Sequence, residues 1–230
     1  YQEDCNCILM SLNYKTQLEY KKQLLNEALF KYAGIRGRII EPFIENPNVL
    51  YYRNQCKLPI REEKGKLFSG LFMPESNQLI KINRCIIHDK QMEDVKKQVM
   101  FILNKYKVRG FDRRSKLGIR YIVIRTILNK TQVSLVGGKD SYSQELIDEI
   151  SNIESVVSVY QNINDDYKSI EILGRNETLL AKEKYLSFNM FGLDINLLPQ
   201  SFFQLNTKQT ERLYDLVNSL VKPCNTIVEA

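Results

Sequence analysis

The strongest constraint on this chain is a run of short segments in which apolar and polar side chains alternate. In residues 49–60, Cys56, Leu58 and Ile60 share one face, whereas Arg53 and Lys57 fall on the other. Successive side chains of a strand point to opposite faces, so this pattern predicts a half-buried strand with one polar face. Most connections between such segments are too short for a crossover helix, so antiparallel pairing should dominate.

Periodicity along the rest of the chain predicts a mixture of helices and strands. Helical spacing of apolar residues predicts helices at 14–33, 90–106, 143–152 and 207–221. Alternation and β-branched residues predict further strands at 66–72, 78–83, 119–127, 131–136, 155–161, 168–173, 184–190 and 193–198, and the start of another at 226–229. The fold class is therefore α+β, a mixed and mainly antiparallel sheet with flanking helices. We expect a central domain over 1–198 and a linking segment with a helix over 199–230.

Composition narrows the setting and the partners. No apolar run approaches the roughly 20 residues that span a bilayer, and no signal-peptide pattern is present, so we expect no membrane association. The five cysteines are odd in number and irregularly spaced, which favours a reducing cytoplasm. The net charge of +6 permits an anionic partner. We expect a monomer, and the initial Tyr1 suggests a fragment.

A basic stretch over 105–120 is the first candidate for binding. Tyr106 and Phe111 are interleaved with its positive charges, and Tyr121 follows directly. Basic groups neutralise phosphates and aromatic rings stack on unpaired bases, so the stretch suggests an RNA contact. A solvated loop is the alternative. The candidate RNA-binding residues are Arg113, Arg114, Lys116 and Arg120.

Two other groups of residues have both a functional and a structural interpretation. Cys5, Cys7 and Cys85 could hold a metal or part of a cluster, or could be small buried hydrophobes. The segment 201–206 leads into a helix start, where ligands often bind, although Phe202 could equally belong to the core.

Several runs match one family, in order, over almost the whole chain. They are CILMSLNYKTQLEYK at 7–21, ENPNVLYYRN at 45–54, GIRYIVIR at 118–125, VVSVYQNIN at 156–164 with ILG at 172–174, and PQSFFQLNTKQTERLY at 199–214. Together these runs resemble the bacterial RNA uracil-5-methyltransferases. The 156–174 run resembles the ribosomal RNA branch of that family.

The resemblance implies the RNA-recognition part of an S-adenosylmethionine-dependent enzyme that methylates C5 of a uridine in 23S ribosomal RNA. It implies that Gln204 contacts S-adenosylmethionine, that Phe202 lines the uracil pocket and that Arg53 lies near the RNA. Residues 227–230, IVEA, match the start of the family's cofactor strand. A Rossmann-like methyltransferase domain with the catalytic cysteine is therefore expected beyond Ala230. No catalytic residue is assigned here, and the chain alone should transfer no methyl group.

The resemblance extends in part to a [4Fe-4S] cluster. Cys7 and Cys85 match two of the family's ligands, but Asp4 stands where a cysteine is expected and Cys5 is displaced by one residue. The ligand set in this chain is therefore incomplete.

Alternative functions remain open at this point. The chain could be a non-catalytic RNA-binding module, part of a transfer RNA uracil-5-methyltransferase, or an iron–sulfur protein for which RNA is incidental. Ribosomal RNA is the expected partner under the leading interpretation.

Overall fold

The chain folds into two compact units. The computed structural model describes residues 7–37, 40–73, 76, 78–223, 225–226 and 228. One unit is Leu50–Thr207, and the other combines Tyr1–Val49 with Lys208–Ala230. The central domain expected at 1–198 includes residues of both units, and its end at 198 falls within the larger unit. Residues 199–207 stay with the larger unit because Asn54 and Arg125 hydrogen-bond the backbone of this segment and of Leu198 just before it. Cys5 and half of the strand expected at 226–229 lie outside the described residues.

The larger unit is built on a seven-stranded sheet of order β3-β2-β1-β4-β5-β6-β7. Its strands are β1 (Gln55–Glu63), β2 (Lys66–Phe72), β3 (Leu79–Lys81), β4 (Ile119–Ile127), β5 (Lys130–Gly137), β6 (Val156–Ile163) and β7 (Asn176–Lys182). Every neighbouring pair is antiparallel except β5 and β6, which are parallel. The helix α3 (Gln144–Ser151) provides the crossover between those two strands. The mixed, mainly antiparallel sheet is thus as expected.

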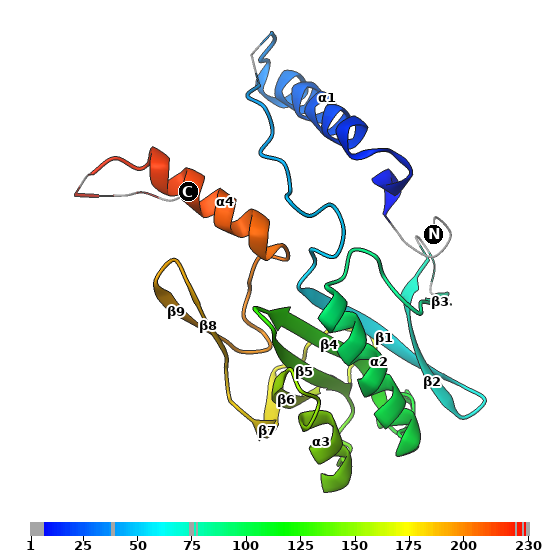
Figure 1. The fold of residues 1–230 in the computed structure, drawn as a ribbon. Coiled ribbons are helices and arrows are strands. Elements are labelled where there is room, and N and C mark those ends of the chain that lie inside the picture. The colour runs from blue at the N-terminus through cyan, green and yellow to red at the C-terminus, as the bar shows by residue number, and fades with distance from the viewer. Residues whose placement is uncertain are drawn as a thin grey trace. The chain divides into compact units, whose positions relative to one another are not determined.

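Two helices cover one face of this sheet. Figure 1 shows α2 (Lys90–Lys105) and α3 on the same side, where α2 packs on β2 and β4 and α3 packs on β6 and β7. The buried residues of β1 that face them are Cys56, Leu58 and Ile60, which confirms the predicted alternation of that strand. Asp89 caps the start of α2 by accepting a hydrogen bond from the backbone N–H of Met92 at 3.1 Å.

Two strand predictions need correction. The strand expected at 49–60 begins too early, because residues 49–54 precede β1, and the strand expected at 168–173 is wrong. Residues 168–173 form part of a loop, and the strand that pairs with β6 is β7, further along the chain. Side chains take the place of a sheet neighbour here, because Asn164 Nδ2 donates to the carbonyls of Glu171 and Ile172, at 2.7 and 3.0 Å. Arg120 binds the carbonyl of Ser169 in the same way at 3.3 Å.

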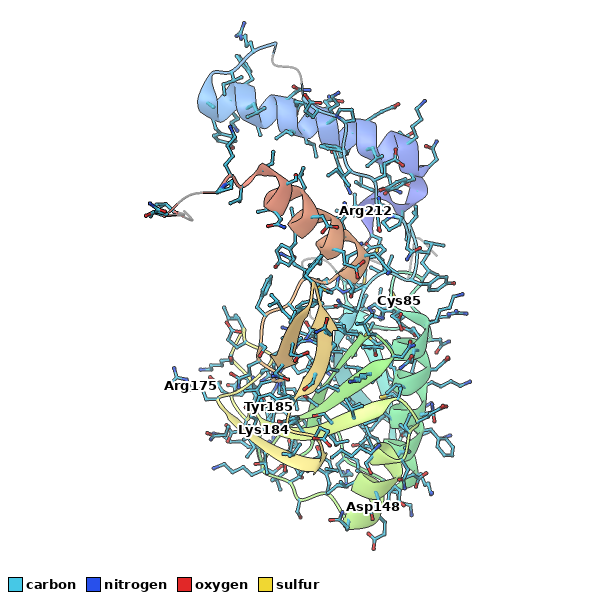
Figure 2. All side chains as sticks on the ribbon, turned by 60° about the vertical axis from the view of Figure 1, so that its left-hand side comes forward. Cys85, Asp148, Arg175, Lys184, Tyr185 and Arg212 are labelled. Atoms are coloured by element: carbon cyan, nitrogen blue, oxygen red, sulfur yellow. The ribbon has the colours of Figure 1, made fainter. Side chains whose placement is uncertain are left out.

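A separate hairpin follows the sheet. Strands β8 (Leu186–Met190) and β9 (Leu193–Leu197) pair with each other, and Figure 2 marks Lys184 and Tyr185 just before β8. A small second core forms around Leu186, Phe188, Met190, Leu197 and Ile127. Phe203 packs against this core from the segment that follows the hairpin.

The smaller unit contains the short 3₁₀ helix η1 (Ile8–Ser11), the helix α1 (Tyr14–Ala33) and nearly all of α4 (Thr207–Leu220). Within it, Gln209 Nε2 donates to the carbonyl of Ile44 at 2.7 Å, and the backbone N–H of Asn46 donates to the Tyr14 hydroxyl at 2.7 Å. The helices at 14–33 and 207–221 are therefore confirmed to within one residue. Of the helices described, none is both long and apolar enough to cross a membrane.

Candidate nucleic-acid interface

The sheet of the larger unit presents a polar face on the side opposite α2 and α3. Lys57 and Arg61 of β1 alternate with the buried residues of that strand, and Tyr121 and Arg125 of β4 stand beside β1. In register, Gln55 pairs with Arg125 and Pro59 with Tyr121. Cationic side chains from adjacent strands are thus gathered on one surface.

Arg125 attaches the segment after the hairpin to this face. Its side chain is only 3% exposed, and its guanidinium donates to the carbonyls of Leu198 and Ser201 at 3.2 and 2.6 Å. Burial lowers the pKa of Arg125 to about 10, so the group stays cationic at neutral pH. A buried charge that satisfies two carbonyls fixes the course of the backbone there.

Asn54 holds the next part of the same segment. Its Nδ2 donates to the carbonyl of Gln204 and to Oγ1 of Thr207, both at 2.9 Å. Its backbone N–H donates to the carbonyl of Leu205, also at 2.9 Å. Residues 198–207 are therefore fixed at both ends by two buried side chains, Arg125 of β4 and Asn54 just before β1.

These contacts enclose a pocket of about 500 Å³, here named the Phe202 pocket. Its lining includes Arg53, Lys57, Arg125, Leu173, Leu205 and residues 199–203. Phe202 is 82% exposed, whereas Phe203 packs edge-on against Phe188, with ring centroids 5.4 Å apart at 80°. The two neighbouring phenylalanines thus have different roles. Phe203 packs against the core and anchors the segment, whereas the ring of Phe202 is exposed to solvent.

The backbone of Arg53 is held by the segment that precedes α2. Its N–H donates to the carbonyl of Ile87 at 2.8 Å, and its carbonyl accepts from the N–H of Asp89 at 2.9 Å. The Nε of Arg53 donates to the carbonyl of Gln55 at 2.9 Å. The arginine therefore has a defined position at the edge of the pocket while other guanidinium nitrogens can still donate.

A buried charged network lies in that supporting segment. The His88 ring donates from Nδ1 to Glu93 at 2.6 Å, and Lys96 Nζ donates to the other Glu93 oxygen at 2.5 Å and to the carbonyl of Asn83 at 3.0 Å. Burial would raise the pKa of Glu93, but the hydrogen bonds from His88 and Lys96 outweigh it and lower that pKa. Burial would lower the pKa of His88, but its hydrogen bonds to Cys85 and Glu93 raise it.

The remaining predicted RNA-binding residues divide into two groups. Arg113 and Arg120 line a second pocket of about 370 Å³ on the same face, here named the Tyr167 pocket. Arg114 and Lys116 are exposed and line neither pocket. Gln204 is half-buried and is held through its backbone carbonyl, and its side chain does not line the Phe202 pocket.

Sequence reasoning missed Asn54 and Arg125. The sequence does mark both residues as unusual, because each is a polar residue within an apolar strand pattern. Asn54 interrupts the apolar side of 49–60, and Arg125 stands within the β-branched run IRYIVIRT. Such residues are found buried when they have specific hydrogen-bond partners.

The described residues do not bring together a ligand set for a metal or a cluster. No group of three or more His, Cys, Asp or Glu side chains is suitably placed within the described part of the chain. The hydrogen bond from His88 lowers the pKa of the Cys85 thiol, although burial acts in the opposite direction. Cys7 and Cys85 belong to different units, and Cys5 lies outside the described residues. The expected cluster therefore finds no support here.

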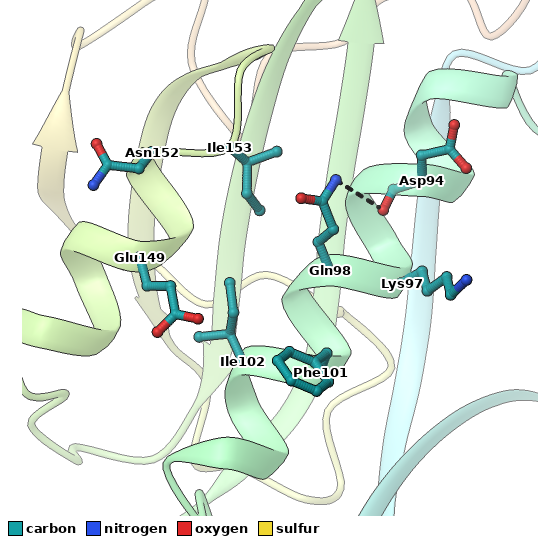
Figure 3. A pocket seen from close by; sticks show the side chains of 8 residues that line it. All are labelled: Asp94, Lys97, Gln98, Phe101, Ile102, Glu149, Asn152 and Ile153. Atoms are coloured by element: carbon teal, nitrogen blue, oxygen red, sulfur yellow. Dashed lines mark hydrogen bonds between the residues drawn. The ribbon is translucent and has the colours of Figure 1, made fainter.

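Another pocket lies between α2 and α3. This pocket has a volume of about 690 Å³, and Figure 3 shows the residues that line it. They include the carboxylates of Asp94 and Glu149 and a single cation, Lys97. Carboxylates repel phosphate, so this surface is unsuited to RNA. The candidate interface is the opposite face of the sheet.

Comparison with known proteins gives a consistent result. No protein-family model matches the chain. The chain is 32% identical to proteins named "uncharacterized RNA methyltransferase" from Clostridium tetani and from Bacillus cereus, in each case over 223 residues and 94% of this chain but 48% of the relative. The chain thus spans about half the length of the curated relatives it matches.

One solved structure has a similar fold. The Pyrococcus abyssi tRNA (uracil-54, C5)-methyltransferase, solved with S-adenosyl-L-homocysteine, matches with a TM-score of 0.72 and 22% identity. The match covers 96% of this chain and 52% of that structure. At 22% identity, this match shows a similar fold and nothing further.

Proposed function

We propose that this chain is the RNA-recognition part of an S-adenosylmethionine-dependent RNA uracil-5-methyltransferase. The observation that carries the proposal is the exposed ring of Phe202 in a pocket with Arg53 and Lys57. An exposed ring stacks on an unpaired base, and the adjacent cations neutralise its phosphates. The names of the relatives supply the methyl-transfer part of the proposal.

The Phe202 pocket fits the binding of a uracil that has left its stack. A base inside a helix is inaccessible to chemistry, so such enzymes bind it extruded. None of the described residues that line the pocket is a cysteine, histidine or carboxylate. The pocket can orient the base, and we propose that the nucleophile for the reaction comes from another part of the protein.

S-adenosylmethionine would supply the methyl group, and we assign Gln204 to it. This residue follows the pocket residue Phe203 directly, and Asn54 fixes its backbone carbonyl at 2.9 Å. A fixed backbone limits the positions its side chain amide can take, which suits recognition of a polar cofactor. We propose the methyl-transfer step for the whole protein and assign only the cofactor contact to Gln204.

We propose 23S ribosomal RNA as the substrate. The runs that resemble the ribosomal branch, 156–164 and 172–174, form β6 and part of the following loop, where Leu173 lines the Phe202 pocket. The branch-typical sequence thus lies on the face we assign to RNA. Transfer RNA is the second candidate, favoured by the name of the structurally similar archaeal enzyme.

Methyl transfer from radiolabelled S-adenosylmethionine tests both proposals. The full-length protein is incubated with 23S ribosomal RNA or with transfer RNA, each transcribed without modifications. We expect 5-methyluridine in the ribosomal RNA. Label in transfer RNA alone would assign the second substrate, and label in neither RNA would reject the enzymatic function.

Binding by variants tests the role of the pocket. Arg53→Ala should weaken RNA binding about tenfold, because it removes a phosphate contact near the base. Arg175→Ala is the matched control, since Arg175 is exposed and lines neither pocket. Equal effects of the two substitutions would show that the pocket has no special part in binding.

A further inference from the structure

We propose that the Tyr167 pocket is a second nucleotide subsite, which takes an unpaired nucleotide of the same RNA close to the target uridine. This inference rests on the proposed function, and it adds a site that the resemblance does not assign. The proposal implies that the RNA is unpaired at the methylated uridine and at one or more nucleotides near it.

The composition of the pocket suits one nucleotide. Three arginines and four aromatic rings surround about 370 Å³, and none of the described lining residues is acidic. The Arg113 guanidinium lies 5.1 Å from the centroid of the Tyr167 ring, and that of Arg61 lies 5.5 Å from the centroid of Phe72. Rings paired with cations bind a stacked base together with its phosphate.

One of the three arginines builds the pocket instead of binding in it. The guanidinium of Arg120 donates to the carbonyls of Asp166 at 2.7 Å, Ser169 at 3.3 Å and Tyr167 at 3.5 Å. It also donates to Oδ1 of Asn164 at 3.3 Å. Arg120 is therefore occupied by the loop that presents Tyr167. Arg113 is exposed and Arg61 is half-buried, so these two can reach a phosphate.

Tyr167 itself is placed for stacking. Its side chain is 45% exposed, and its loop is held through backbone atoms, so the ring is not needed to keep the loop in position. An accessible ring on a fixed backbone loses little conformational entropy when a base stacks on it.

The two pockets are lined by neighbouring parts of the same loop and of the same strand. The loop 164–175 contributes Tyr167 to one pocket and Leu173 to the other. Lys57 of the Phe202 pocket and Arg61 of the Tyr167 pocket lie four residues apart on the same face of β1, a rise of about 13 Å. A short single strand can span that distance, so one RNA segment can occupy both sites.

Binding of a fluorescent oligouridylate of about 12 nucleotides, measured by anisotropy over a range of salt concentrations, tests the subsite in the full-length protein. Tyr167→Ala should weaken binding about tenfold, because base stacking is lost, and Tyr167→Phe should restore it. Arg113→Ala should reduce the slope of log affinity against log salt by about 0.7, as expected for one phosphate contact. Arg109→Ala is the matched control, because Arg109 is 83% exposed, pairs with Glu62 at 3.4 Å and lines neither pocket.

The outcomes separate this inference from the proposed function. If the wild type methylates RNA but Tyr167→Ala binds as tightly as Tyr167→Phe, or Arg113→Ala and Arg109→Ala have equal slopes, the subsite is rejected and the function stands. If the variants weaken binding as expected but the wild type transfers no methyl group to any RNA, the subsite stands and the enzymatic proposal fails. If the wild type does not bind the oligouridylate, the subsite is rejected.

Discussion

Arg125 donates from Nη2 to the backbone carbonyl of Ser201 over 2.6 Å, across 76 residues of sequence. The strand β4 and the segment that carries Phe202 are joined through this contact. The charge of Arg125 is buried and none of the described carboxylates is paired with it, so the two carbonyls at Leu198 and Ser201 provide its hydrogen bonds. The shape of the Phe202 pocket therefore depends on a residue in the middle of the sheet.

Replacing Arg125 by methionine should both destabilise the protein and weaken RNA binding. Methionine keeps an apolar stem of similar length, but the carbonyls of Leu198 and Ser201 lose their donor. We expect the free energy of unfolding to fall by about 2–4 kcal/mol, measured by urea denaturation. Arg175→Met is the control, because Arg175 is exposed and projects outward in Figure 2. A change below about 0.5 kcal/mol in Arg125→Met would show that the anchor is not needed.

The adjacent rings of Phe202 and Phe203 should respond in opposite ways. Phe202→Ala removes an exposed ring, so the free energy of unfolding should change by less than about 0.5 kcal/mol while RNA affinity falls about tenfold. Phe203→Ala breaks the contact with Phe188 and should destabilise the protein by about 2–3 kcal/mol. Urea denaturation and RNA anisotropy on the same preparations compare the two. Similar profiles for both variants would contradict the division of roles.

The fold was largely predictable because alternation and periodicity are local signals. The strand pattern of 49–60 predicted the buried side of β1 correctly, since the faces of a strand follow from spacing alone. The wrong strand at 168–173 has the same kind of alternation. There the carbonyls of Glu171 and Ile172 bind the side chain of Asn164, which lies outside the predicted strand. Competition from a side chain is a tertiary effect that a local pattern does not contain.

The candidate site was only partly predictable for a similar reason. Resemblance drew attention to Phe202 and Arg53, but it could not separate the exposed Phe202 from its core neighbour Phe203. Arg120 was grouped with the other basic residues of 105–120. Its guanidinium instead binds backbone oxygens of a loop more than 40 residues away. Charge alone does not distinguish a cation that binds RNA from one that builds the binding surface.

Asn162 should control the loop shared by the two pockets. Its Nδ2 donates to the carbonyl of Gly174 at 3.0 Å, and its Oδ1 accepts from the N–H of Gly174 at 2.7 Å. Asn162→Leu has a similar volume but cannot make either bond, so we expect a loss of about 2–4 kcal/mol in unfolding free energy. The affinity of the protein for RNA should also fall, because this loop contributes residues to both pockets. The exposed Asn176→Leu serves as the control. A stable Asn162→Leu protein with normal RNA affinity would show that the loop is held by other contacts.

The buried carboxylate of Glu93 should make stability depend on pH in the acidic range. Its side chain is 6% exposed, and the hydrogen bonds from His88 and Lys96 lower its pKa in the fold despite the opposing effect of burial. A lowered pKa means that the ionised form is favoured by folding. Its contribution is therefore complete above the unfolded pKa of about 4.3 and is lost as the pH falls through the folded value.

Glu93→Gln should cost about 3–5 kcal/mol at neutral pH, because Lys96 is left as a buried charge without its carboxylate partner. Urea denaturation of both proteins from about pH 7 down to about pH 3 measures the difference in unfolding free energy. That difference should shrink as the pH falls, since protonation removes the charge of Glu93 in the wild type as well. Asp94→Asn, the adjacent and exposed carboxylate of α2, should change stability by less than about 0.5 kcal/mol throughout. A difference between wild type and Glu93→Gln that stayed constant with pH would mean that the ionised form of Glu93 does not stabilise the fold.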